Sequence, residues 1–144
     1  MQEIELAREI EAPIETVFAV LTDHEGMVRW SRAREVVLRH PGDPEPNGVG
    51  AVRVIRASGL AIEEEITAFD PPKRMEYRIV AGLPVRDHHG EIHLEPAGRS
   101  TRVVWRVRFR PRIPGTGWLL RRGLARALGE LLDGLARVLS LPPG

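Results

Sequence analysis

The sequence predicts an α+β fold in which an antiparallel sheet of seven strands curls around a long C-terminal helix. The first observation is the spacing of apolar residues between Gly117 and Leu139, which matches one face of a helix. This stripe consists of Leu120, Leu124, Ala127, Leu128, Leu131, Leu135 and Val138. The second observation is that most of the preceding chain alternates apolar and polar residues between turns, which is typical of strands. A stripe this long needs a large apolar partner, and the predicted sheet supplies one.

The N-terminal part is predicted to form one strand and two short helices. Residues 2–11 alternate isoleucine or leucine with glutamate, as in a half-buried strand. Pro13 is typical of a helix start, and the apolar spacing over residues 14–21 predicts a short helix after it. A second short helix is expected from Asp23 towards Trp30.

The remaining strands are separated by turns rich in glycine and proline, such as the tight hairpin at Ser58-Gly59. We expect Thr116 to cap the start of the long helix, and Pro142 and Pro143 to end it. Strands are expected at residues 36–39, 49–57, 60–69, 75–81, 85–95 and 101–110.

Composition excludes several classes of protein. The 144 residues are enough for one domain, spanning residues 1–144, with a real core. The absence of cysteine excludes disulfides and thiolate metal sites. The charged N-terminus is not a signal peptide, and no apolar run is long enough for stable membrane insertion, so we expect a cytoplasmic protein. A net charge of +1 does not favour nucleic acid as a partner, and a homodimer stays open.

Hairpin geometry places particular residues on the concave face of the sheet. If Ala57 faces Leu60, then Arg53 lies opposite Glu64. The concave face is then apolar except for Arg53, Glu64 and His88. Matching apolar residues across the later turns predicts the pairs Ile66–Tyr77, Ile79–His88, Tyr77–Gly90, Met75–Ile92, Leu94–Val103, Ile92–Trp105, Gly90–Val107 and His88–Phe109.

Charged residues and histidines alternate along the opposite face of the sheet. The same register sets Asp87, His89, Glu91, His93 and Glu95 against Arg110, Arg108, Arg106, Val104 and Arg102. Opposite charges across an antiparallel pair stabilise it modestly. His89, Glu91 and His93 have the spacing to bind a divalent metal. We nevertheless expect no metal site, because a flat, solvated face with arginines opposite does not enclose an ion.

Several segments resemble the START-like, polyketide cyclase/dehydrase superfamily. They are Ala12 to Phe18 (APIETVF), Leu21 to Asp23, Trp30, and Phe69 to Arg74 (FDPPKR). The resemblance covers essentially the whole chain, because the order of the elements also agrees. It implies the helix-grip fold with a cavity for an apolar ligand between the sheet and the long helix. Members of the superfamily include lipid carriers, hormone and alkaloid binders and aromatase/cyclases, and no shared catalytic triad or metal site maps onto this sequence.

The residues of the concave face are the candidates for lining such a cavity. We expect Trp30 near its mouth, and in its wall Arg53, Glu64, Tyr77, His88, Trp105, Phe109 and Met75. Two positions remain open for Arg53 and Glu64: a solvated rim salt bridge, or a buried pair that anchors a ligand. Gly90, opposite Tyr77, either leaves a gap that a ligand fills or lets the sheet bend.

Three functions are compatible with these residues. The first is non-catalytic binding of a small hydrophobic ligand, such as a lipid, an isoprenoid or an aromatic polyketide. The second is an aromatase/cyclase or dehydratase acting on a polyketide-like substrate, with His88 and Glu64 as candidate catalytic residues. The third is a partner-binding module with a filled core. Binding is favoured because acid–base residues are few, and no pattern indicates a cofactor.

Overall fold

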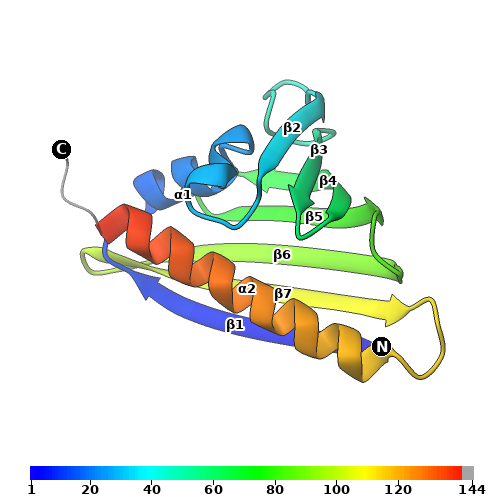
Figure 1. The fold of residues 1–144 in the computed structure, drawn as a ribbon. Helices are drawn as coiled ribbons and strands as arrows, with labels where there is room; N and C mark the ends of the chain where they lie inside the picture. The colour runs from blue at the N-terminus through cyan, green and yellow to red at the C-terminus, as the bar shows by residue number, and fades with distance from the viewer. Residues whose placement is uncertain (141–144) are drawn as a thin grey trace.

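A curved antiparallel sheet forms the body of the computed structural model, which describes residues 1–140 (Figure 1). The helices are α1 (Ile14–Thr22), the 3-10 helix η1 (Glu25–Arg29) and α2 (Gly117–Ser140). The strands are β1 (Gln2–Ile10), β2 (Glu35–His40), β3 (Val52–Ala57), β4 (Leu60–Asp70), β5 (Arg74–Ala81), β6 (Val85–Ala97) and β7 (Ser100–Pro111). The predicted elements are therefore present, although the second short helix is a 3-10 helix and β3 begins later than expected.

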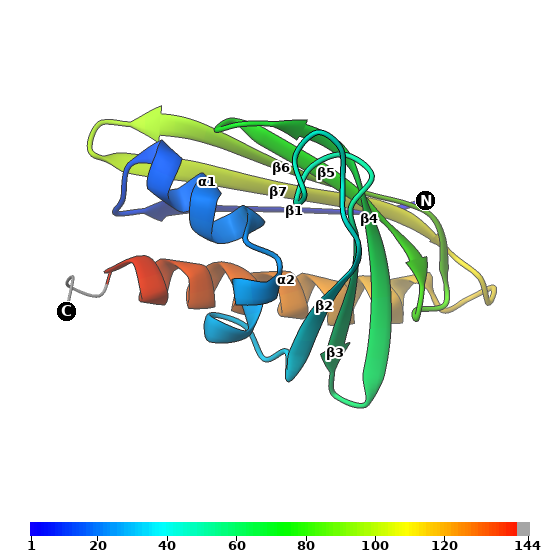
Figure 2. The same cartoon turned by 90° about the horizontal axis from the view of Figure 1, so that it is seen from above.

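The strands follow the order β1-β7-β6-β5-β4-β3-β2, and the sheet curls so that α1 and α2 lie on its concave side (Figure 2). Most of the predicted registers are confirmed. Arg53 pairs with Glu64, and Ile66 pairs with Tyr77. The pairs Tyr77–Gly90, Met75–Ile92, Leu94–Val103, Ile92–Trp105 and Gly90–Val107 also form as expected.

The predicted register is wrong at the start of β6, where the strand contains a bulge. Asp87 and His88 together oppose Phe109, and Arg110 pairs with Arg86 instead of Asp87. Asp87 has a φ of 52°, in the left-handed region that aspartate tolerates better than most residues. The Asp87 carboxylate still lies 3.7 Å from Nε of Arg110. The sequence did not reveal the bulge, because one inserted residue leaves the alternation on either side intact.

Pairing between β5 and β6 stops partway along both strands. The last backbone pair joins Tyr77 to Gly90, although β5 continues to Ala81. Beyond that pair, the backbone N–H of Ile79 donates to the imidazole Nδ1 of His88 at 3.1 Å. A side chain thus replaces the missing backbone acceptor, and His88 is the neighbour of Ile79, as predicted.

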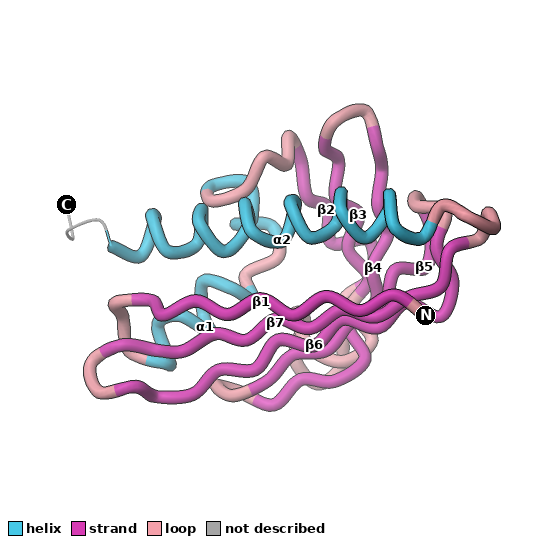
Figure 3. Tube along the Cα trace, turned by 90° about the horizontal axis from the view of Figure 1, so that it is seen from below, coloured by secondary structure: helices cyan, strands magenta, loops and turns pink. Residues whose placement is uncertain are grey.

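Helix α2 runs along β1 and β7 (Figure 3). Its buried leucines are Leu128, Leu132 and Leu135, and these pack into the core of the protein. Gly134 brings the helix against the segment that follows η1, because a Cβ at this position would lie 1.8 Å from the carbonyl oxygen of Trp30. Part of the apolar stripe seen in the sequence therefore packs into the core, and the rest faces the space between the helix and the concave side of the sheet.

Thr116 precedes the first residue of α2, as predicted, but its side chain does not cap the helix. The Thr116 hydroxyl donates to the carbonyl of Ile113 at 2.6 Å, while its own carbonyl accepts the N–H of Leu120 at 3.1 Å. Pro142 and Pro143, expected to end the helix, lie outside the described residues. Within residues 1–140, no helix has both the length and the apolar character needed to cross a membrane.

Candidate functional site

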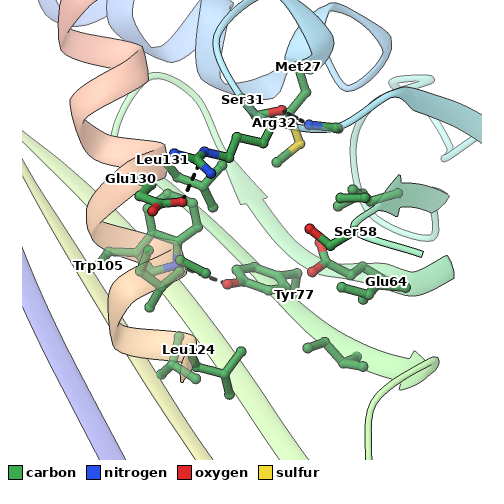
Figure 4. Close-up of a pocket in the computed structure, with 18 of the residues that line it drawn as sticks. Met27, Ser31, Arg32, Ser58, Glu64, Tyr77, Trp105, Leu124, Glu130 and Leu131 are labelled. Carbon is green, nitrogen blue, oxygen red and sulfur yellow. Dashed lines mark hydrogen bonds and ion pairs between the residues drawn. The ribbon is translucent and has the colours of Figure 1, made fainter. Parts of the chain in front are cut away.

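A cavity of about 420 Å³ lies between the concave face of the sheet and α2 (Figure 4). A liquid water occupies about 30 Å³, so this space is large enough for a small organic molecule. Its wall is mostly apolar and includes Ile55, Ile62, Ile79, Val107, Leu124 and Leu131. Residues from β3 to β7, the η1 segment and α2 therefore contribute to one enclosure.

Arg53 and Glu64 lie inside this enclosure. Only 4% of Arg53 and 7% of Glu64 is exposed. The guanidinium donates through Nε at 2.9 Å and through Nη2 at 2.7 Å, and both bonds reach Oε1 of Glu64. Burial of two charges is costly unless they are paired, and this pair is joined by two hydrogen bonds. The pair is therefore buried, and it is not a solvated bridge at the rim.

His24, between α1 and η1, completes the buried polar group and was not predicted. It is fully buried, its Nδ1 accepts from Nη1 of Arg53 at 3.0 Å, and its Nε2 donates to the carbonyl of Asn47 at 2.9 Å. Burial, reinforced by the charge of Arg53, lowers the pKa of His24 to about 3. His24 is thus neutral at pH 7. No sequence pattern linked it to Arg53, which lies 29 positions away on another element.

Tyr77 spans the floor of the cavity. The indole Nε1 of Trp105 donates to the Tyr77 hydroxyl oxygen at 2.9 Å, and the two rings meet edge to face. The Arg53 guanidinium lies 5.8 Å from the centre of the Tyr77 ring. Burial raises the pKa of Tyr77, so the phenol keeps its proton. The space left by Gly90 is filled by this ring, because a Cβ there would lie 2.3 Å from Tyr77.

His88 also lines the cavity, but its chemistry is constrained. Because Nδ1 accepts the Ile79 amide, the ring proton sits on Nε2 when the histidine is neutral. Burial and the nearby His89 lower the pKa of His88 to about 4, so it is neutral at pH 7. His88 therefore presents a hydrogen-bond donor rather than a basic nitrogen.

Two of the eight predicted site residues do not line the cavity. Trp30, Arg53, Glu64, Tyr77, His88 and Trp105 do. Met75 and Phe109 are fully buried in the core instead. The concave face is longer than the cavity: Met75 pairs with Phe69, which packs against Phe18 of α1, and Phe109 pairs with the first residue of β1. A residue on the concave face of the sheet therefore does not necessarily line the cavity.

A family model described as polyketide cyclase / dehydrase and lipid transport matches residues 1–140. The chain belongs to this family. Among solved structures, a START superfamily protein from Mycobacterium smegmatis is 12% identical, with a TM-score of 0.82 and 95% of this chain and 96% of that chain covered. The Aha1 dimer from Colwellia psychrerythraea is 19% identical, with a TM-score of 0.77 and full coverage of both chains. Ara h 8.0201 is 17% identical, with a TM-score of 0.75 and coverage of 97% and 99%.

At these identities, the likeness to solved structures shows the fold alone. It confirms the helix-grip architecture, and the family model confirms the resemblance to the polyketide cyclase/dehydrase superfamily that the sequence suggested. No curated protein matches the chain. The family description covers both ligand transport and polyketide chemistry, so the side chains of this member have to decide between them.

The mouth of the cavity in this polyketide cyclase/dehydrase family member is crossed by an ion pair (Figure 4). Arg32, in the segment before β2, reaches Glu130 of α2 at 3.4 Å. Arg126, one helical turn away, also approaches Glu130 at 3.5 Å. Both arginines are largely exposed, so this pairing contributes little to stability but narrows the opening.

The convex face of the sheet carries the predicted charged residues, and the predicted register is confirmed from His89 to Glu95. The side chains nevertheless bond to other partners. His89 lies 2.8 Å from Glu76, and Glu91 bonds to His93 at 2.9 Å, which lowers the pKa of Glu91. Arg106 lies opposite Glu91 as expected, but forms its ion pair with Glu5. In the described part of the chain, one His/Glu group has the proximity for a metal: Glu76, His89 and Glu91, whose ligand atoms lie within 4.8 Å of one another.

Proposed function

We propose that this protein binds a small hydrophobic molecule, such as a lipid, an isoprenoid or an aromatic polyketide, without transforming it. The observation that supports this most strongly is the buried Arg53–Glu64 pair in a mostly apolar cavity of about 420 Å³. Apolar walls supply affinity through buried contact area, and a few fixed polar groups orient the ligand. A cavity of this size also argues against the third possibility, a partner-binding module with a filled core.

The polar groups suit binding better than proton transfer. A general base must have a free lone pair at the reacting proton. The Nδ1 lone pair of His88 is occupied by the Ile79 amide, and both ring nitrogens of His24 bond to protein groups. Glu64 is held in an ion pair with Arg53. The site therefore lacks a histidine base.

A polyketide cyclase or dehydratase activity is the second candidate. The family description supports it, and so does the placement of the Glu64 carboxylate and the Tyr77 phenol on the same cavity. A carboxylate and a phenol on one wall are capable of moving a proton during ring closure. For a cyclase, Glu64→Gln would abolish turnover of an aromatic polyketide substrate while ligand binding persisted.

Binding is tested with Nile red, an uncharged apolar dye, and with a matched pair of variants on α2. Leu131 lines the cavity, whereas Leu119 lies on the same helix and is 57% exposed. Leu131→Ala should weaken dye binding through lost contact area, and Leu119→Ala should leave it unchanged. Native mass spectrometry of protein purified from its own host should also show a co-purifying small molecule. Absence of saturable dye binding to the wild type would overturn the proposal.

A further inference from the structure

The two oxygens of the Glu64 carboxylate differ in the hydrogen bonds that they accept from the protein. Both hydrogen bonds from Arg53 end on Oε1. Oε2 accepts no hydrogen bond from any residue within 1–140, although Glu64 is 7% exposed and lines the cavity. A carboxylate oxygen that accepts no bond from the protein, in a cavity with mostly apolar walls, is a strong acceptor. It is therefore positioned for a donor that the ligand brings.

Three of the five N–H groups of the Arg53 guanidinium are already bonded to the protein. Its Nε and Nη2 bond to Glu64, and its Nη1 bonds to His24. Its charge is balanced by the carboxylate of Glu64, and neutral His24 adds none. An anionic ligand would therefore gain little from Arg53, because Glu64 already balances its charge, and the free oxygen of Glu64 would repel it. The ligand would also lose its own hydration on entering the cavity.

Two donors face the same space from the other side. The Tyr77 hydroxyl accepts from Trp105, and its own proton has no acceptor within residues 1–140. The Nε2–H of His88 likewise has no acceptor in this range. Both groups suit a carbonyl or ether oxygen on the ligand and remain neutral at pH 7. Apart from the charged residues at its mouth, such as Arg32 and Glu130, the cavity thus offers Glu64 as a charged acceptor and these two neutral donors.

We infer that the cavity selects uncharged apolar molecules that carry an alcohol or phenol hydroxyl, which donates to Oε2 of Glu64, and that it rejects carboxylates. The inference rests on the proposed binding function and narrows its ligand class. It also replaces the expectation of an Arg53 anchor for a ligand carboxylate. Hydrogen bonds to charged, buried acceptors are stronger than neutral ones, so the hydroxyl should improve affinity by about tenfold.

Three naphthalenes of similar size test this selection on the wild-type protein by displacement of Nile red. They are 2-naphthol, which donates a hydrogen bond, 2-methoxynaphthalene, which cannot, and 2-naphthoate, which is anionic at pH 7. We expect 2-naphthol to bind about tenfold more tightly than the ether, and naphthoate to bind most weakly. Equal affinities for the naphthol and the ether, or tighter binding of naphthoate, would overturn the inference while leaving the proposed function intact.

Glu64→Gln provides the second arm, with Glu65→Gln as its control. Glu65 is the next residue on β4, points to the other face and pairs with Arg78 at 2.7 Å. Removing the charge at position 64 should reduce the preference for the naphthol and raise the affinity for naphthoate, whereas Glu65→Gln should change neither. If Glu64→Gln does not fold, the wild-type series decides alone. Failure of Nile red and all three naphthalenes to bind would overturn the proposed function as well.

Discussion

At the scale of single residues, one glycine determines how the floor of the cavity is built. Gly90 leaves the space in which the Tyr77 ring lies against β6, and this places the phenol within 2.9 Å of the Trp105 indole. A side chain at position 90 and the Tyr77–Trp105 bond are therefore incompatible. The glycine makes room for the Tyr77 side chain of the neighbouring strand.

Gly90→Ala should displace the Tyr77 ring, because the new Cβ would lie 2.3 Å from it. Overpacking of this kind costs about 1–3 kcal/mol of stability. The Trp105 indole N–H resonance should shift as its bond is lost, which NMR would detect. Tyr77→Phe, which keeps the ring and removes the hydroxyl, should shift the same resonance at a smaller cost in stability. An unchanged melting temperature for Gly90→Ala would contradict this account.

His24 and His88 should make stability depend on pH. Their pKa values are lowered to about 3 and about 4 from an ordinary value near 6.5. As pH falls below 6.5, the unfolded chain takes up protons that the folded protein does not, so stability decreases towards pH 4. Each histidine should contribute about 1.4 kcal/mol per pH unit in this window. Urea unfolding between pH 7.5 and 4.5 measures this slope.

His88→Gln is the matched variant for the pH series. It should reduce the slope by one histidine, and His40→Gln, at an exposed position, should not change it. An identical slope for His88→Gln and the wild type would show that His88 is protonated as easily in the folded protein as in the unfolded chain.

At the scale of elements, two glycines of α2 have opposite surroundings. A Cβ at Gly134 would lie 1.8 Å from the Trp30 carbonyl oxygen, in the backbone after η1, whereas a Cβ at Gly123 would meet nothing within 4 Å. The first glycine sets how closely the helix approaches the mouth of the cavity. The second lies in open surroundings and carries only the entropic cost of a glycine in a helix.

Gly134→Ala should therefore push α2 away from Trp30 and lower the melting temperature, and it should weaken Nile red binding by widening the mouth. Gly123→Ala should stabilise the protein by up to about 1 kcal/mol through helix propensity, with no effect on binding. Thermal unfolding with and without dye measures both effects. If the two variants behaved alike, close contact at Gly134 would have no role.

At the scale of the whole molecule, the two faces of the sheet carry different chemistry. The concave face encloses the cavity, while the convex face holds the cluster of Glu76, His89 and Glu91. Arg74 lies 3.1 Å from the Glu76 carboxylate and competes with a cation for it. The cluster is also partly exposed, which favours hydration of a free ion over its capture.

We expect calorimetric titration with zinc to show no tight, stoichiometric binding to this face. The reason is that Glu76 and Glu91 already bond to Arg74 and the histidines, so an ion would have to displace these contacts. The double variant His89→Ala/His93→Ala serves as the control. Tight binding to the wild type that disappears in the double variant would show that the cluster is a metal site.

Most of the fold followed from the sequence because matching apolar residues across short turns leaves few registers. This reasoning correctly set Arg53 against Glu64 and Tyr77 against Gly90. It failed where a local irregularity changes the register of a strand, or where a distant loop supplies a residue of the buried polar group. The inserted Asp87 shifts the alternation by one residue near the start of β6, where only Val85 precedes the shift on the buried face. His24 reaches Arg53 from a segment whose position depends on how the whole sheet curls.

The gap in pairing between β5 and β6 leaves this part of the cavity wall with few hydrogen bonds between the two strands. Past Tyr77–Gly90, the two strands are joined through the His88 ring, and the adjoining Ile79 and Leu83 both face the cavity. Separating the strands there breaks the bond between His88 and Ile79, whereas lifting α2 from the core would expose the buried leucines Leu128, Leu132 and Leu135. If the protein binds a ligand as proposed, the ligand would enter and leave by separation of these two strands, and amide hydrogen exchange at Ile79 would be the earliest sign of it.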